Sequence, residues 1–167
     1  LKALLKENWE VGKNTARGSI INKNNSQILF SPQSEWYSKL ATLLFRNSAI
    51  VGNARPRYLV APMANSYKEG SYYDWHFDSP TMGSRRADLS FTLFLTPPDE
   101  YDGGELEIET EYKNLVSKVR SWEILLYPTE FRHRVLEVSN GQRVCIVGWI
   151  ESWVKDPNLR SDILSLE

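Results

Sequence analysis

The sequence predicts a mostly β protein, a sandwich, jelly roll or barrel, with at least one helix packed on an outer face. Three observations support this class. Apolar and polar residues alternate with a period of two along many short segments from Arg55 onward. Turn-forming residues separate these segments at a spacing of about eight to twelve residues, which is typical of all-β folds. Aromatic residues, which favour strands, make up 12% of the chain.

The expected elements follow in chain order. Residues 1–30 are polar and show no clear periodicity. Ser31 then provides an N-cap and Pro32 a first helical position, so Pro32 to about Asn47 is predicted to be an amphipathic helix. Strands are predicted at Arg57–Val60, Leu89–Leu95, Glu105–Glu109, Leu115–Val119, Ile124–Tyr127, His133–Val138 and Arg143–Ile150, with turns at 68–70, 97–99, 102–104 and 139–141. A short helix is expected after Glu151.

Length and composition suit a single domain, because 167 residues with 41% apolar content can bury one core. Within it we expect helical or irregular support over about 1–54, a jelly-roll core over about 55–150 and a short C-terminal helix over about 151–167. The net charge of -1 does not favour nucleic acid as a partner. The single cysteine, Cys145, excludes an internal disulfide framework. With no membrane-spanning run and no signal-peptide pattern, we expect a cytoplasmic protein without a membrane partner. Because the chain begins at Leu1, we also expect a missing upstream segment.

The chain contains two histidines, and both lie where a metal site would need them. His76 and Asp78 form a His-x-Asp pattern on a predicted strand, so their side chains share a face with Cα atoms about 6.6 Å apart. His133 opens a later strand, which a jelly roll can bring beside the first. Taken singly, each histidine could equally be a surface or half-buried residue without a ligand. Together the three residues match the facial triad that holds non-haem Fe(II).

The segment around these residues resembles a known family. Residues Tyr67–Asp78 read Tyr-x-x-Gly-x-x-Tyr-x-x-His-x-Asp. Further motifs follow in the same order, namely Arg86–Ser90, Tyr101–Leu106, Leu126–Pro128, His133–Val135, Gly141–Val144 and Trp149–Ser152. As a set they are similar to prolyl-hydroxylase-like Fe(II)/2-oxoglutarate oxygenases, and in particular to bacterial PKHD-type hydroxylases. The resemblance implies a double-stranded β-helix, the cupin-like jelly roll, and His76, Asp78 and His133 as iron ligands.

The resemblance also implies 2-oxoglutarate as cosubstrate, O2 as oxidant and ascorbate as a candidate reductant. Arg143 matches the family's basic residue that holds the C5 carboxylate of 2-oxoglutarate, which a guanidinium can grip bidentately. The alternative is a solvated arginine after a turn. Alternation places Arg143 on the same face as Cys145, Val147 and Trp149, and this mostly apolar face favours the buried position.

Two tyrosines and one loop are further candidates. Tyr67 and Tyr73 match family tyrosines near the cosubstrate, although simple packing explains them equally well. Phe94 stands where some relatives carry a tyrosine that helps bind the C5 carboxylate. The connection after the His-x-Asp strand is a hypothetical mobile lid over the substrate, with Ser79, Pro80, Thr81, Met82, Gly83, Arg85 and Arg86 as candidate substrate-loop residues, and an ordinary surface loop is as good an explanation.

Other charged residues indicate less about the function. The alternating Glu105, Glu107 and Glu109 are expected on a solvated strand face. Four arginines are expected near the entrance of the predicted active site: Arg85, Arg86, Arg132 and Arg134. They would suit a polar or acidic peptide substrate, or they would simply be solvated.

The resemblance implies a hydroxylase that acts on an amino-acid side chain, with peptidyl proline the first candidate and a free amino acid the second. The cosubstrate would be converted to succinate and CO2. Asp78 favours hydroxylation, because related halogenases lack this carboxylate. Two other classes stay open, a jelly-roll binding module with a vestigial or structural metal and a cupin-like metal enzyme without 2-oxoglutarate. A buried Arg143 near the metal would argue against the binding module.

Overall fold

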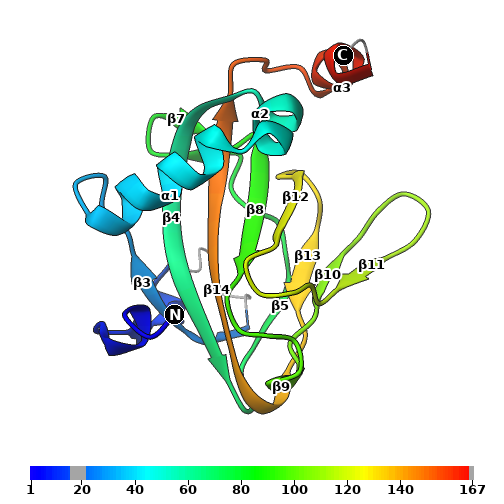
Figure 1. Cartoon of the computed structure of the whole chain (residues 1–167). Coiled ribbons are helices and arrows are strands. Elements are labelled where there is room, and N and C mark those ends of the chain that lie inside the picture. The colour runs from blue at the N-terminus through cyan, green and yellow to red at the C-terminus, as the bar shows by residue number, and fades with distance from the viewer. Residues whose placement is uncertain (16–21, 166–167) are drawn as a thin grey trace.

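The computed structural model describes residues 1–15 and 22–165 (Figure 1). Its strands are β1 (Glu10–Val11), β2 (Lys23–Asn24), β3 (Ser26–Leu29), β4 (Pro56–Lys68), β5 (Tyr72–His76), β6 (Thr81–Met82), β7 (Arg85–Arg86), β8 (Leu89–Phe94), β9 (Tyr101–Gly103), β10 (Leu106–Ile108), β11 (Leu115–Ser117), β12 (Ile124–Pro128), β13 (His133–Val135) and β14 (Val138–Ser152). The helices are α1 (Glu35–Arg46), α2 (Ser48–Ala54) and α3 (Pro157–Ser165), with short 3-10 turns at Leu4–Lys6 and Gly12–Thr15.

The strands form two antiparallel sheets. The larger sheet has the order β1-β3-β4-β14-β8-β12, with β9 pairing to β14, and the smaller has the order β11-β10-β13-β5-β2. A separate two-stranded ribbon joins β6 to β7. Apolar side chains of both sheets meet between them in one cluster that includes Leu106 and Val135 from the smaller sheet and Tyr67 and Cys145 from the larger. The mostly β architecture predicted from the sequence is confirmed.

The helix predicted from Pro32 starts later than expected. Its N-cap is Ser34, whose Oγ accepts a hydrogen bond from the Tyr37 backbone N–H at 3.1 Å. Ser31 and Pro32 instead form a turn before the helix, in which the Ser31 carbonyl oxygen accepts from the Ser34 backbone N–H. The predicted N-cap, Ser31, is therefore wrong, and Ser34 caps the helix.

A second helix, α2, was not predicted. Asn47 ends α1 and at once caps α2, since its Oδ1 accepts from the Ile50 backbone N–H at 3.1 Å. The segment of seven residues is too short to show a clear helical period. Both helices lie across the outer face of the larger sheet, where Leu40, Leu44 and Ile50 pack on the sheet's apolar residues (Figure 1). This confirms the helix on an outer face.

β14 is one continuous strand, and the turn predicted at 139–141 is wrong. The strand pairs with β9 at its start, with β4 from Gln142 to Ser152 and with β8 from Cys145 to Ile150. Gly141 bends the strand at φ 78°, where a Cβ would collide with the Glu100 carbonyl oxygen. The Asn-Gly pair therefore bends β14 without ending it.

Both ends of the chain differ from the expected boundaries. Residues before Arg55 were predicted to be helical or irregular, but β1 and β3 extend the larger sheet and β2 extends the smaller one. At the other end β14 continues to Ser152, and the C-terminal helix begins only at Pro157. The expected helical end at 166–167 lies outside the described residues. Within the described ranges, no helix has both the length and the apolar content that crossing a membrane requires.

Candidate functional site

A cavity of about 500 Å³ opens between the two sheets. Its walls include Tyr67, Arg143 and Trp149 from the larger sheet and Tyr73 and Val135 from the smaller one. The residues predicted to hold iron and the arginine predicted to hold the cosubstrate line this same space. The structure thus brings together side chains that lie far apart in the sequence.

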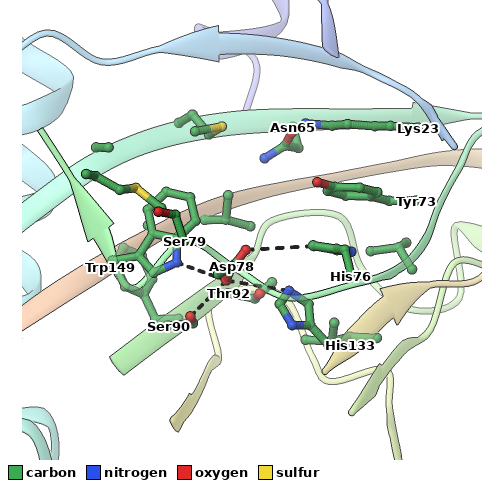
Figure 2. Close-up of a pocket in the computed structure, with 18 of the residues that line it drawn as sticks. Lys23, Asn65, Tyr73, His76, Asp78, Ser79, Ser90, Thr92, His133 and Trp149 are labelled. Carbon is green, nitrogen blue, oxygen red and sulfur yellow. Dashed lines mark hydrogen bonds and ion pairs between the residues drawn. The ribbon is translucent and has the colours of Figure 1, made fainter. Parts of the chain in front are cut away.

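Strand pairing brings the two histidines together. β13 runs antiparallel to β5, and His133 is paired directly with His76. Asp78, just beyond the end of β5, has its Oδ1 3.7 Å from His76 Nε2 and its Oδ2 3.6 Å from His133 Nε2 (Figure 2). One donor atom from each residue lies within 4.8 Å of the other two, a spacing that could hold one metal ion.

Backbone carbonyls orient both imidazoles. His76 Nδ1 lies 2.8 Å from the Asp74 carbonyl oxygen, and His133 Nδ1 lies 3.0 Å from that of Phe131. A carbonyl oxygen can only accept, so each Nδ1 carries a proton, and in the neutral form of either imidazole Nε2 has a lone pair free to bind a metal. Burial, together with the nearby His133 charge, lowers the pKa of His76 to about 4. His76 is therefore neutral at neutral pH, the form that binds metals.

Two side chains hold the Asp78 carboxylate in place. Trp149 Nε1 donates to Asp78 Oδ2 at 2.9 Å, and Ser90 Oγ lies 3.0 Å from the same oxygen (Figure 2). Neither donor contacts Oδ1, which faces His76. Sequence reasoning missed both roles, because Trp149 was expected only as apolar lining and Ser90 only as part of a motif. Such neighbours usually tune the affinity of a metal site.

Arg143 is buried beside the same cavity, with 1% of its surface exposed. Its guanidinium lies 5.2 Å from the Tyr67 ring and 5.0 Å from the Phe94 ring, and its Nη1 donates to Cys145 Sγ at 3.1 Å. Within the described part of the chain, its Nε has no hydrogen-bond partner. A buried cation with so few acceptors is costly unless an anion joins it. This environment fits a ligand carboxylate.

Gly104 makes room for that arginine. A Cβ at Gly104 would lie 3.0 Å from Arg143 Cδ, and the backbone there has φ 66°. The Asp-Gly-Gly segment looked like an ordinary turn in the sequence, and the structure gives its last glycine a packing role.

Comparisons with known proteins agree with this geometry. The sequence profile of the 2OG-Fe(II) oxygenase superfamily matches residues 62–151. The chain belongs to this superfamily. A PKHD-type hydroxylase of Hyphomonas neptunium is 40% identical over 95% of this chain and 74% of the relative. A PKHD-type hydroxylase of Prochlorococcus marinus is 39% identical over 95% of this chain and 73% of the relative. The chain is also similar to the crystal structure of a Pseudomonas putida prolyl-4-hydroxylase, with a TM-score of 0.68, 16% identity and coverage of 92% of this chain and 82% of that one.

These findings confirm the resemblance, the jelly-roll fold and the enzyme class predicted from the sequence. The chain is a 2-oxoglutarate-dependent dioxygenase, and its family implies Fe(II), 2-oxoglutarate and O2. The His–Asp–His set fits such a metal, because two imidazoles and one carboxylate place donor atoms within 4.8 Å of one another.

In this oxygenase Tyr73 packs flat on a predicted iron ligand. Its ring stacks on His76 with a centroid distance of 3.6 Å and an interplanar angle of 10°. Burial, with a smaller effect of the Asp78 charge, raises the pKa of Tyr73 to about 12. Tyr67 is buried, and burial also raises its pKa. Both hydroxyls therefore stay protonated and can donate to an anion.

Lys23 is a cavity residue that sequence reasoning missed. It is 4% exposed, its Nζ lies 4.7 Å from the Tyr73 ring centroid, and it donates to Gln27 Oε1 at 3.2 Å. Burial lowers its pKa to about 8, against an opposing effect of the Asp78 charge, so it is mostly protonated at neutral pH. It lies on the short strand β2 in a polar region without periodicity, which hid its position.

The proposed lid is a small hairpin formed by β6 and β7. Ser79, Met82 and Gly83 of this segment line the cavity. Four other residues predicted for the substrate loop are not part of the lining: Pro80, Thr81, Arg85 and Arg86. Arg86 is bound to Asp88 at 3.1 Å and donates to the Ser152 carbonyl oxygen at 2.8 Å.

Two expectations about strand faces need correction. Glu107 was expected to be solvated, but it is 8% exposed and lies 2.6 Å from Arg134 Nε. Strand alternation through His76 and Asp78 would turn the intervening Phe77 away from the site, but Phe77 lines the cavity. β5 ends at His76, so strand alternation does not extend to Phe77.

Proposed function

We propose that this oxygenase hydroxylates an amino-acid side chain, with peptidyl proline the first candidate. In this proposal His76, Asp78 and His133 hold Fe(II), and Arg143 binds the C5 carboxylate of 2-oxoglutarate. One oxygen atom of O2 enters succinate as CO2 is released, and the other becomes the hydroxyl group of the product. Ascorbate would serve as the reductant that returns oxidised iron to Fe(II).

The observation that carries this proposal is the position of Arg143. A binding module gains nothing from burying a guanidinium beside the cavity that holds a metal-type triad, with its Nε unpaired. A dicarboxylate that reaches the metal with one end needs a cation for the other end. Tyr67, whose ring contacts the guanidinium, would help to enclose that end.

The other residues of the chain would orient and protect the reacting groups. Bound iron supplies the oxygen chemistry. Trp149 and Ser90 keep the Asp78 carboxylate in one orientation, and the backbone carbonyls of Asp74 and Phe131 do the same for the imidazoles. The apolar walls limit the access of water to the site.

The test is succinate formation by the Fe(II)-reconstituted protein with 2-oxoglutarate and O2. Wild type should form succinate even without substrate, and should show the weak visible charge-transfer band of an Fe(II)–2-oxoglutarate complex. His76→Ala should lose both, and Arg143→Ala should need much more 2-oxoglutarate for either. Folded, iron-loaded wild type that binds no 2-oxoglutarate and forms no succinate would contradict the proposal.

A further inference from the structure

Lys23 gives the cavity a second cation, separate from Arg143. Arg143 lies on β14 between the rings of Tyr67 and Phe94. Lys23 comes from β2, the edge strand of the smaller sheet, and reaches the cavity beside Tyr73 (Figure 2). Tyr73 contacts both Lys23 and His76, so one aromatic ring links this ammonium group to the proposed metal position.

A second hydrogen-bond donor lies near Lys23. Asn65 on β4 lines the cavity, and its Oδ1 accepts from Asn25 Nδ2 at 2.8 Å. The amide nitrogen of Asn65 is then the group left to face a ligand. Asn65 is paired with Gln27 on β3, the residue that accepts from Lys23. An ammonium group and an amide N–H on one wall are a donor set that suits a carboxylate.

The charges of the loaded cavity point the same way. Among the described residues, Asp78 is the one carboxylate that lines the cavity. In the proposed complex the divalent metal and Arg143 would be balanced by Asp78 and the 2-oxoglutarate dianion. Lys23 adds a further positive charge to the residues that line the cavity, and a carboxylate is the ligand group that forms the stronger, charge-assisted hydrogen bond with an ammonium group.

The wall beyond Asn65 is apolar. Met63 follows on the same face of β4, and Leu29 on β3 is its direct partner in the sheet. Val147 on β14 pairs with Met63 from the other side. A ligand whose carboxylate is at Lys23 would therefore place an aliphatic body along this wall.

We propose that Lys23 and Asn65 bind a carboxylate of the substrate, so that this oxygenase selects aliphatic substrates with a carboxylate close to the hydroxylated carbon. The inference rests on the proposed function and narrows its substrate class. The carboxylate can come from a free or C-terminal amino acid, or from an acidic side chain next to the target residue in a peptide.

The experiment measures binding and needs no turnover. The full chain is loaded with Mn(II) and 2-oxoglutarate, and the dissociation constant of each probe is obtained from the paramagnetic relaxation of its protons. The probes are the N-acetyl derivatives of proline, leucine and valine, each as the free acid and as the amide. A second pair, acetyl-Pro-Asp-amide and acetyl-Pro-Asn-amide, tests the side-chain source.

In the wild type we expect at least one acid to bind about tenfold or more tightly than its amide, the usual gain for a charge-assisted hydrogen bond. Lys23→Met should bind the acid and amide alike, while its Kd for 2-oxoglutarate changes less than twofold. Lys39→Met, which removes an exposed lysine from α1, should behave as wild type. A preference confined to the aspartyl peptide would identify the side-chain source.

Two results would overturn the inference and leave the proposed function intact. One is wild type that binds 2-oxoglutarate but treats every acid and amide alike, including binding neither. The other is a loss of 2-oxoglutarate affinity in Lys23→Met as large as that in Arg143→Met, which would assign Lys23 to the cosubstrate. If wild type binds no 2-oxoglutarate, the proposed function fails and the inference fails with it.

Discussion

The histidine pair and Asp78 share one site but are positioned in different ways. His76 and His133 are fixed by the pairing of β5 with β13 and by carbonyl oxygens two residues earlier in the chain. Asp78 lies beyond the strand, and its carboxylate depends on side chains from β8 and β14. Backbone geometry therefore sets two of the three proposed ligands, and side-chain hydrogen bonds set the third. Mutations of neighbouring side chains should affect Asp78 far more than the histidines.

The largest expected effect is a loss in the free energy of unfolding at low pH, caused by the protonation of His76. Burial holds the pKa of His76 at about 4, below the ordinary 6.5. As the pH falls below 6.5, His76 becomes protonated in the unfolded chain. In the native metal-free protein it stays neutral until the pH reaches about 4. The stabilisation is thus complete above pH 6.5 and is lost by about pH 4, a change of about 3 kcal/mol.

Urea unfolding of the metal-free protein between pH 7 and pH 4.5 measures this loss. His76→Gln removes the titrating group and should flatten the dependence. Equal slopes for wild type and His76→Gln would show that other groups control the acid sensitivity.

On the Asp78 side, Trp149→Phe removes the indole donor and keeps most of the aromatic volume. We expect the Kd for Fe(II) to rise about thirtyfold, since neighbours that orient a ligand typically account for 10- to 100-fold in affinity. Competition with a metal chelator measures it. Trp153→Phe, at an exposed tryptophan beyond β14, is the matched control and should not change the Kd. Unchanged iron affinity in Trp149→Phe would mean that the strands alone position Asp78.

At the arginine end, Gly104→Ala should raise the Kd for 2-oxoglutarate about tenfold, because the new methyl group displaces the Arg143 stem and weakens a charge-assisted contact. Gly70→Ala has the same backbone strain at φ 76° but no atom within 4 Å of the added carbon, so it separates strain from contact. Titration of the charge-transfer band gives both constants. Equal losses in the two variants would remove the packing role of Gly104.

Ser90→Ala should have the smallest effect, about a threefold rise in the Kd for Fe(II). The Trp149 indole still donates to the same Asp78 oxygen, so one of the two hydrogen bonds survives. The same chelator competition applies. A loss larger than that in Trp149→Phe would reverse the order of the two donors.

The sequence predicted the features that depend on periodicity and motif. The segments that carry His133 and Arg143 were predicted to be strands, and the sequence has two histidines, so a two-histidine site had to contain both of them. What it missed depends on contacts between distant segments. Lys23 lies on a strand of two residues, too short for any period, and is brought to the site by the pairing of that strand with β5, opposite Tyr73. The hydrogen bond from Trp149 to Asp78 spans 71 residues and leaves no local pattern.

β14 also determines which parts of the site can move. It carries both Arg143 and Trp149, and from Cys145 to Ile150 it pairs with β4 on one edge and with β8 on the other. The amide protons of this doubly paired segment should exchange with solvent only on the slow timescale of global unfolding. Another part of the cavity lining belongs to the β6–β7 ribbon, whose two strands pair only with each other in the sheets described and whose Met82 packs near Trp149 of β14. The amide protons of this ribbon should exchange earlier than those of β14. Ligands would then enter past the more mobile ribbon and be oriented by side chains on the rigid strand β14.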